Sequence, residues 1–167
     1  CAADPSWSKG MAAAGCAPAT SGLAIEAVHT EARVKTALVN DPVVGVRVIN
    51  AGVGGNSSRD GLARLQKDVL AHKPDVVVLF FGTNDGRVDA PTKHVPLPEY
   101  EKNLSTIIDR CREIGVKVIL GTMPPIDPVP YFTRHVKKAF DAVGGLEKQI
   151  QEYRAVALRV GESKKVP

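Results

Sequence analysis

The stretch Asp75-Val-Val-Val-Leu-Phe-Phe81, bounded by Pro74 and Gly82, decides the fold. It is an unbroken run of aliphatic and aromatic residues, shorter than a typical helix and much shorter than a membrane span. A run of this kind between turn residues is typical of a strand in a parallel sheet, buried on both faces. We therefore predict such a strand over 75–81, with a sheet built around it.

Helical and strand patterns alternate on either side of this strand, and residues 1–21, rich in Ala, Pro, Ser and Gly, are expected to be irregular. This alternation predicts βαβ units, right-handed crossovers and one mainly parallel α/β domain over 22–167. The predicted strands are 46–50, 75–81 and 116–122, and the predicted helices are 22–40, 60–72, 98–115 and a pair over 136–158 interrupted at Gly144-Gly145.

The composition is that of a globular domain, with 44% hydrophobic and 24% charged residues in 167. The net charge of +4 is spread along the chain, and only two pairs of adjacent lysines occur, Lys137-Lys138 and Lys164-Lys165. Nucleic-acid binding needs basic residues clustered on one face, so we expect no nucleic-acid partner. No apolar run approaches the roughly 18 residues that a membrane span needs, and the sequence predicts a soluble protein.

The three cysteines, Cys1, Cys16 and Cys111, form no CxxC pair and have no histidine at ligand spacing. We therefore expect no metal site and no cofactor. Cys111 falls on the apolar side of the helix predicted over 98–115, where a buried thiol is expected. Cys1 and Cys16 would be able to pair in an exported protein, and Cys1 is either an arbitrary first residue or the lipidated cysteine of a lipoprotein.

Three loops follow the predicted strands and should meet at one edge of the sheet, where α/β proteins bind ligands: 51–58, 82–95 and 123–130. Acyl transfer needs fixed hydrogen-bond donors aimed at the oxygen that becomes negative in the tetrahedral intermediate. Gly54-Gly55 can bring a backbone N–H close to a ligand at a helix N-terminus, and Asn84 can present a side-chain amide. These two loops are the candidate oxyanion site.

Residues 48–57, Val-Ile-Asn-Ala-Gly-Val-Gly-Gly-Asn-Ser, resemble the second sequence block of the SGNH (GDSL-like) hydrolases, and Gly82-Thr-Asn-Asp85 resembles the third. The order and spacing of the blocks also match that family. Similarity continues through 61–65, 73–75 and 121–125, so that the resemblance covers about 45–160. It implies a flavodoxin-like three-layer α/β/α sandwich and a serine hydrolase that acts on small acyl esters or thioesters.

The resemblance also implies roles for single residues. Gly55 would supply a backbone N–H and Asn84 a side-chain amide to the oxyanion hole. Asp85, Met123 and Pro124 are predicted to lie at the binding site, Asp85 as a cap or brace of its loop. No residue is expected to bind a metal.

The family's nucleophile motif, Gly-Asp-Ser at the end of a first strand, does not occur in residues 1–167. Ser6, Ser8 and Ser21 lack that setting. Ser21 immediately precedes the predicted helix that leads to the second block, so it is a candidate nucleophile, with helix capping as the alternative.

The family's Asp-x-x-His block is also absent from this sequence. His72, His94 and His135 have no acid three residues earlier. Only Glu26-Ala-Val-His29 has that spacing, but it precedes the second block, so a catalytic role would require a rearranged chain. The alternative is an ordinary i, i+3 pair on an amphipathic helix.

These absences predict an incomplete sheet, in which the family's first and fifth strands are not recognisable. The Ala-rich segment 11–20 would have to fill the slot of the first strand, between 46–50 and 75–81, and the fifth strand should begin just after Pro167. Two functional hypotheses remain: an ester hydrolase, or a catalytically inactive remnant that binds ligands.

A dinucleotide-binding loop at Gly52-Val-Gly54-Gly55 is disfavoured, because Ser57 replaces the third glycine of the fingerprint and no P-loop lysine follows.

Overall fold

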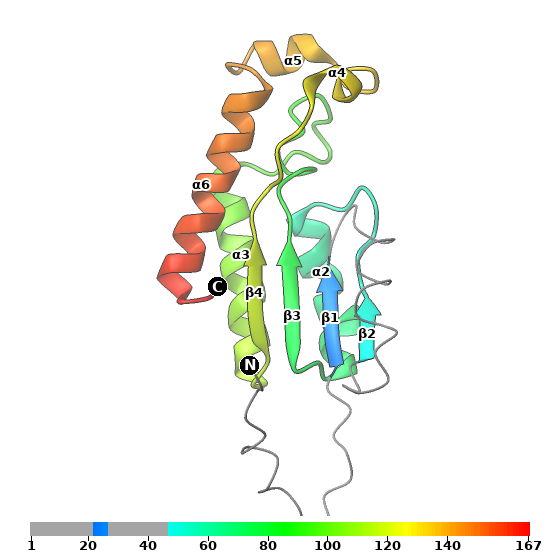
Figure 1. Cartoon of the computed structure of the whole chain (residues 1–167), viewed down its shortest axis with the longest axis vertical. Helices are drawn as coiled ribbons and strands as arrows, with labels where there is room; N and C mark the ends of the chain where they lie inside the picture. The colour runs from blue at the N-terminus through cyan, green and yellow to red at the C-terminus, as the bar shows by residue number, and fades with distance from the viewer. Residues whose placement is uncertain (1–21, 27–46) are drawn as a thin grey trace, which may run out of the picture.

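The computed structural model of the chain describes residues 22–26 and 47–167 (Figure 1). These residues form four strands and six helical segments. The strands are β1 (Gly22–Glu26), β2 (Arg47–Asn50), β3 (Val76–Phe80) and β4 (Lys117–Gly121). The helical segments are α2 (Ser58–Asp68), the 3-10 turn η1 (Leu70–His72), α3 (Leu97–Glu113), α4 (Pro128–Tyr131), α5 (Lys137–Asp141) and α6 (Leu146–Lys164).

The strands form one parallel sheet in the order β2-β1-β3-β4. β1 occupies the central slot, where Ile25 pairs with Asn50 on one side and with Val78 on the other. The predicted helix over 22–40 is therefore wrong over 22–26, and 27–40 lies outside the described residues. The expectation that 11–20 fills the central slot is wrong as well.

β1 was missed because its sequence, Gly-Leu-Ala-Ile-Glu, suits a helix as well as a strand. Leu, Ala and Glu are good helix formers, and three consecutive apolar residues in a segment of five do not distinguish the helical period from the strand period. The position between β2 and β3 offers backbone hydrogen-bond partners on both sides, and pairing with these two strands outweighs the local preference for a helix.

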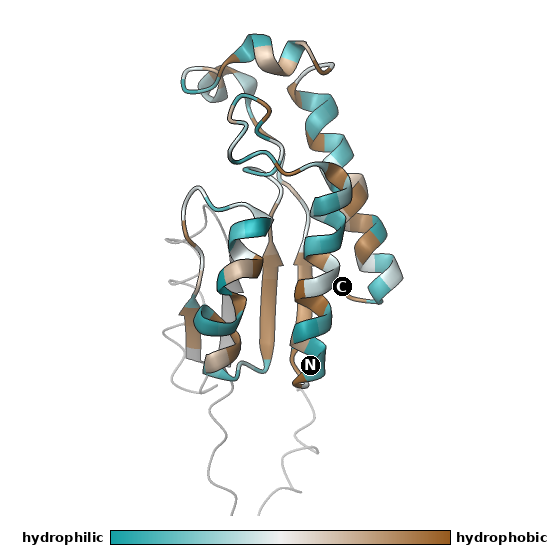
Figure 2. Ribbon diagram, turned by 180° about the vertical axis from the view of Figure 1, so that it is seen from behind, coloured by the Kyte–Doolittle hydropathy of each residue, from teal (hydrophilic) through white to brown (hydrophobic). Residues whose placement is uncertain are grey.

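Helices α2, α3 and α6 lie on one face of the sheet (Figures 1 and 2), with α2 packed against α3 and α3 against α6, whereas α4 and α5 lie beyond the strand ends. On that face Val77 and Leu79 are fully buried. On the other face Val78 and Phe80 are only half-buried, so the prediction that this strand is buried on both faces is wrong. The α/β fold with a parallel sheet is confirmed, and the described helices form one of the two outer layers of a three-layer sandwich.

The local sequence explains where several of the helices begin and end. Ser57 caps α2 in a reciprocal capping box with Asp60, whose carboxylate accepts the Ser57 N–H at 2.8 Å. The pair predicted over 136–158 is α5 and α6, separated at Gly144-Gly145, and both glycines have positive φ angles. α4 was not predicted. Cys111 is fully buried in α3, as expected.

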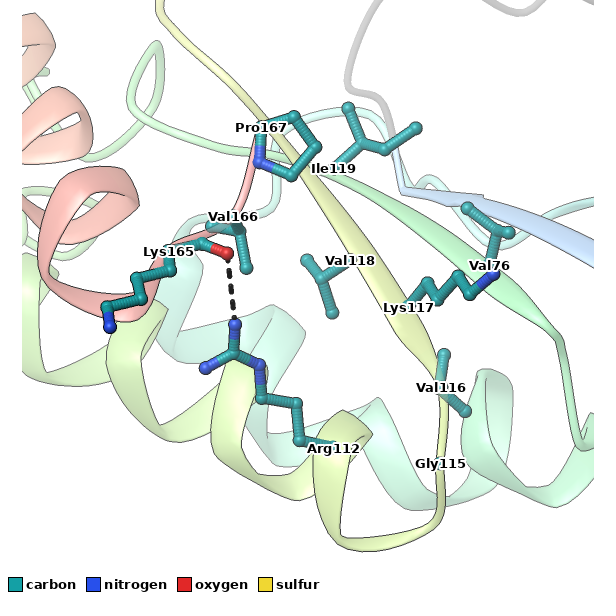
Figure 3. A pocket seen from close by; sticks show the side chains of 10 residues that line it. All are labelled: Val76, Arg112, Gly115, Val116, Lys117, Val118, Ile119, Lys165, Val166 and Pro167. Atoms are coloured by element: carbon teal, nitrogen blue, oxygen red, sulfur yellow. Dashed lines mark hydrogen bonds between the residues drawn. The ribbon is translucent and has the colours of Figure 1, made fainter.

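The chain returns to the outer edge of the sheet after α6. The Leu120 N–H of β4 donates to the carbonyl of Pro167 at 2.7 Å, and Arg112 of α3 donates to the carbonyl of Lys165 at 3.3 Å. Figure 3 shows Val166 and Pro167 beside β4, around a cavity of about 530 Å³. In the described part of the chain, no helix is both long and apolar enough to cross a bilayer.

Candidate active site

The loops that follow β2 and β3 meet at the carboxyl edge of the sheet, as predicted from the parallel strands. Asn84 joins them, because its side-chain Nδ2 donates to the carbonyl of Asn56 at 2.9 Å. Asn84 is only 7% exposed. Its amide is therefore held against the carbonyl of Asn56, the residue that follows Gly55.

Asp85 braces this arrangement from beneath. Its side chain is fully buried, and its carboxylate accepts the Ser58 N–H at the start of α2, at 3.0 and 3.2 Å, and the Gly82 N–H at 3.2 Å. Burial raises the pKa of Asp85, although the hydrogen bonds from Ser58 and Gly82 oppose that shift. The carboxylate fixes the third-block loop against the N-terminus of α2, where a negative charge is favoured.

Gly55 has a φ angle of +83°, in the left-handed region that favours glycine. A Cβ atom built on Gly55 would meet nothing within 4 Å, and the same is true of Gly54, which has no positive φ. A glycine is therefore favoured at position 55 by the backbone conformation, and not because neighbouring atoms leave no room for a side chain.

Arg64 of α2 holds the same turn from the side. Its Nη1 donates to the carbonyl of Ala51 at 2.5 Å and its Nε to the side-chain oxygen of Asn56 at 2.8 Å. The Asn56 N–H closes the turn on the carbonyl of Val53 at 3.1 Å. The acceptor of the Asn84 side chain is thus itself fixed by two further contacts.

Two buried tyrosines hold the loop after β3 from the core. The Tyr153 hydroxyl donates to the carbonyl of Asp85 at 3.0 Å and also contacts the carbonyl of Val95. The Tyr100 hydroxyl donates to the carbonyl of Phe81 at 3.0 Å. Burial raises the pKa of both phenols, so they remain neutral donors. The loop that carries Asn84 is rigidly attached to α3 and α6.

A cavity of about 560 Å³ is lined by Asn84 and by Tyr131 of α4. Helices α4 and α5 extend past the strand ends (Figure 1). Asn84 and Pro124, both predicted, line this cavity. Met123, also predicted, is 2% exposed in the core, and its carbonyl accepts from Arg154 Nε at 2.6 Å. The lining residues are Phe80, Thr83, Asn84, Arg87, Pro124, Ile126, Tyr131, Arg134 and His135.

Ser21, the candidate nucleophile, lies outside the described residues. Its neighbour Gly22 begins β1 at the amino edge of the sheet, whereas Asn84 follows the carboxyl end of β3. The direction of β1 therefore gives Ser21 no support as the nucleophile. Cys1, Cys16 and His29 also lie outside the described residues.

The pair Asp89 and His135, of which His135 lines this cavity, was not predicted from the sequence. The Asp89 carboxylate, whose side chain is 3% exposed, bonds to Nδ1 of His135 at 3.0 Å and to Nε of Arg87 at 3.3 Å. His135 was set aside because no acid stands three residues before it. Its partner stands 46 residues before it, and no local spacing rule would have found the pair.

Asp89 makes the stability of the fold depend on pH. Burial alone would raise the pKa of Asp89, but hydrogen bonds from Arg87 and His135 outweigh it and hold the pKa below its ordinary value. A carboxylate of lowered pKa stabilises the fold above its unfolded pKa, about 3.9, and this contribution is lost as the pH falls through the folded pKa.

We therefore expect the free energy of unfolding of wild type to exceed that of Asp89→Asn at neutral pH. The excess should shrink below about pH 4, where the carboxylate becomes protonated. Urea unfolding of both proteins at a series of pH values measures it. A difference that stays constant into the acid range would contradict the assigned contacts.

No three His, Cys, Asp or Glu side chains within 22–26 and 47–167 are grouped so that they could hold a metal ion.

Comparison with known proteins identifies relatives of this chain. Residues 13–167 match the GDSL-like lipase/acylhydrolase family. The chain is 33% identical over 127 residues to the uncharacterized lipoprotein YqeF of Bacillus subtilis, covering 72% of this chain and 52% of the relative. It is 35% identical over 121 residues to an acetylxylan esterase of Geobacillus stearothermophilus, covering 66% and 52%.

A solved structure shows the same architecture. The lipase/acylhydrolase from Enterococcus faecalis superposes with a TM-score of 0.67 at 31% identity, covering 88% of this chain and 74% of that one. The chain spans about half the length of the curated relatives it matches.

Proposed function

Because this chain belongs to the GDSL-like lipase/acylhydrolase family, we propose that it acts on small acyl esters by SGNH-type acyl transfer. In this proposal the Gly55 N–H and the Asn84 side-chain amide bind the oxygen that becomes negative when the acyl carbonyl is attacked. Each donor of this kind contributes about 3 kcal/mol of transition-state stabilisation, because it needs no reorganisation during the reaction.

The bond between Asn84 and Asn56 is the observation that carries the proposal. A side-chain amide has two N–H hydrogens, and the bond at 2.9 Å uses one of them. The second N–H belongs to a rigidly held side chain, which lines the cavity and is bonded to the residue that follows Gly55. Preorganised donors at the edge of a cavity are what stabilisation of an oxyanion requires.

The cavity supports a substrate with a small acyl group. Its walls carry apolar surface from Phe80, Ile126 and Tyr131 beside the polar Asn84. The acetylxylan esterase relative is named for the removal of acetyl groups, and we extend that class to this chain as short acyl esters. Thioesters of the same acyl groups present the same carbonyl and belong to the same proposal.

A second candidate is a non-catalytic binding domain built on the same cavity. It is favoured by one observation, the absence of Gly-Asp-Ser and Asp-x-x-His motifs from residues 1–167. The two candidates differ in turnover, since a binding domain would hold short acyl esters without cleaving them.

Neighbouring glycines provide a matched test of the Gly55 assignment. Gly55→Ala places an L side chain at a φ angle of +83°, so the backbone must shift and turn the N–H away from the oxyanion. We expect kcat/KM for a short-chain nitrophenyl ester to fall about tenfold or more. Gly54→Ala, which meets open space without a positive φ, should retain nearly the wild-type value. Equal losses in the two variants would contradict the assignment.

A further inference from the structure

Two arginines, Arg87 and Arg134, line the same cavity as Asn84, and the first of them belongs to the Asn84 loop itself. The Arg87 N–H donates to the carbonyl of Asn84 at 3.2 Å, so one backbone turn carries both residues. The Arg87 side chain is 27% exposed. A guanidinium group is therefore attached, through a measured contact, to the residue proposed to bind the acyl oxygen.

Asp89 sets the orientation of the Arg87 guanidinium. The Asp89 side chain is 3% exposed, and its carboxylate accepts from Arg87 Nε and Nη2, both at 3.3 Å. These two bonds use one edge of a planar group that has five N–H donors in all. The N–H groups of Nη1 take no part in this pair, so Arg87 can offer them to a ligand in the cavity that it lines.

Asp89 also holds the segment that carries Arg134. Its carboxylate bonds to His135 Nδ1 at 3.0 Å and accepts the Val136 N–H at 3.4 Å. The His135 ring stacks on Tyr131 with centroids 4.0 Å apart, and the Arg134 N–H donates to the Tyr131 carbonyl at 3.2 Å. One buried carboxylate thus links the two segments that bring the arginines to the cavity.

The charges around this cavity do not cancel. Two guanidinium groups line it, and the Asp89 carboxylate pairs with only one of them, that of Arg87. Arg134 is exposed, and no acid within 22–26 and 47–167 forms an ion pair with it. With His135 neutral, one positive charge is left beside the apolar surface of Phe80 and Ile126. Charge of one sign in a cleft with apolar walls attracts an ion of the other sign.

We propose that Arg134 and Arg87 bind a carboxylate on the alcohol part of the substrate, so that the site prefers acyl esters of alcohols that carry a carboxylate. The proposal rests on the proposed function, because it places the acyl carbonyl at Gly55 and Asn84. The cavity of about 560 Å³ lies in the range that holds whole small-molecule ligands, so it has room for the alcohol part as well as a short acyl group. A carboxylate supplies the one negative charge that balances Arg134, and its two oxygens match the planar N–H groups of a guanidinium.

Two acetyl esters of nearly the same shape that differ by one charge test this proposal, 4-acetoxybenzoate and the neutral 4-acetoxybenzamide. The absorbance of the released phenol gives kcat and KM for the full chain. Arg134→Gln should lower kcat/KM for 4-acetoxybenzoate about tenfold, mainly by raising KM, because a hydrogen bond to a charged group is lost. The value for 4-acetoxybenzamide should change little. Arg134→Lys keeps the charge without the planar group and should lose less, and high salt should reduce the effect of Arg134→Gln.

Arg110→Gln is the matched control, because Arg110 is an exposed arginine on α3 that does not line this cavity. It removes the same charge from the chain and should leave the ratio of the two kcat/KM values unchanged. The proposal is overturned if Arg134→Gln and Arg110→Gln change that ratio equally. It is also overturned if Arg134→Gln lowers kcat/KM for both esters in proportion, as a structural defect would.

Binding of the two product phenols separates this proposal from the proposed function, because it needs no turnover. In calorimetric titrations, Arg134→Gln should weaken the binding of 4-hydroxybenzoate about tenfold and leave that of 4-hydroxybenzamide unchanged. If neither ester is hydrolysed but 4-hydroxybenzoate binding depends on Arg134, the proposed function fails and the carboxylate site stands. Hydrolysis that depends on Asn84 but not on Arg134 leaves the oxyanion site standing and removes the carboxylate site.

Discussion

Asn84→Ala should lower kcat/KM for short acyl esters by about two to three orders of magnitude, the loss expected when one rigid oxyanion donor is removed. The substitution deletes the amide that links the second and third blocks through Asn56. It leaves the cavity walls in place, so KM should change less than kcat. Initial rates with a nitrophenyl ester measure both constants.

Asn84→Asp tests the loss of the hydrogen-bond donor with little change in side-chain shape. A carboxylate has nearly the same shape but no hydrogen to donate, so it should reproduce the loss of activity seen with alanine. The free energy of unfolding should fall by only about 1 kcal/mol in Asn84→Ala, because a single hydrogen bond is lost. A decrease in kcat/KM of less than threefold in both variants would contradict the role of Asn84.

Asp85→Ala should destabilise the fold by about 3 kcal/mol or more, because the Ser58 and Gly82 N–H groups would be left buried without their acceptor. The same change should release the loop that carries Asn84 and lower activity through disorder of the site. The urea midpoint of unfolding measures the first effect, and kcat/KM the second.

Asp60→Ala provides the control for this prediction, since Asp60 also binds a backbone N–H at the start of α2. Its side chain is 38% exposed, so water can replace it, and the expected loss is about 1 kcal/mol. Asp85→Asn retains an oxygen acceptor, so its loss of unfolding free energy should lie between those of Asp85→Ala and Asp60→Ala. Equal destabilisation by Asp85→Ala and Asp60→Ala would mean that Asp85 does not brace the site.

The parts of the fold that local patterns determine were predicted correctly. β3 follows from its continuous apolar run, and the separation of α5 from α6 follows from Gly144-Gly145. The meeting of the loops after β2 and β3 also followed, because parallel strands place their carboxyl ends at one edge.

The errors arose where distant parts of the chain decide the local structure. β1 is a strand because β2 and β3 leave a slot between them, and its five residues, three of them good helix formers, give no local sign of that slot. Met123, which the sequence predicts at the binding site, is buried in the core, whereas its neighbour Pro124 lines the cavity.

The pairing of Asp89 with His135 has the same origin. Asp89 follows the Asn84 loop, whereas His135 lies between α4 and α5, and only the folded chain brings the two together. A rule that requires an acid at a fixed spacing from a histidine cannot find such a pair. The residues of the candidate site that belong to the second and third sequence blocks were predictable, and the tertiary contacts of the site were not.

The most direct test of the oxyanion site is a ¹⁵N–¹H correlation spectrum of the chain titrated with a short alkylphosphonate, a tetrahedral anion that resembles the intermediate. We expect the Gly55 backbone signal and the Asn84 side-chain signals to shift together along one binding curve, and Asn84→Ala to weaken binding. Shifts confined to other residues, or equal binding by Asn84→Ala, would contradict the claim that these two groups hold an oxyanion.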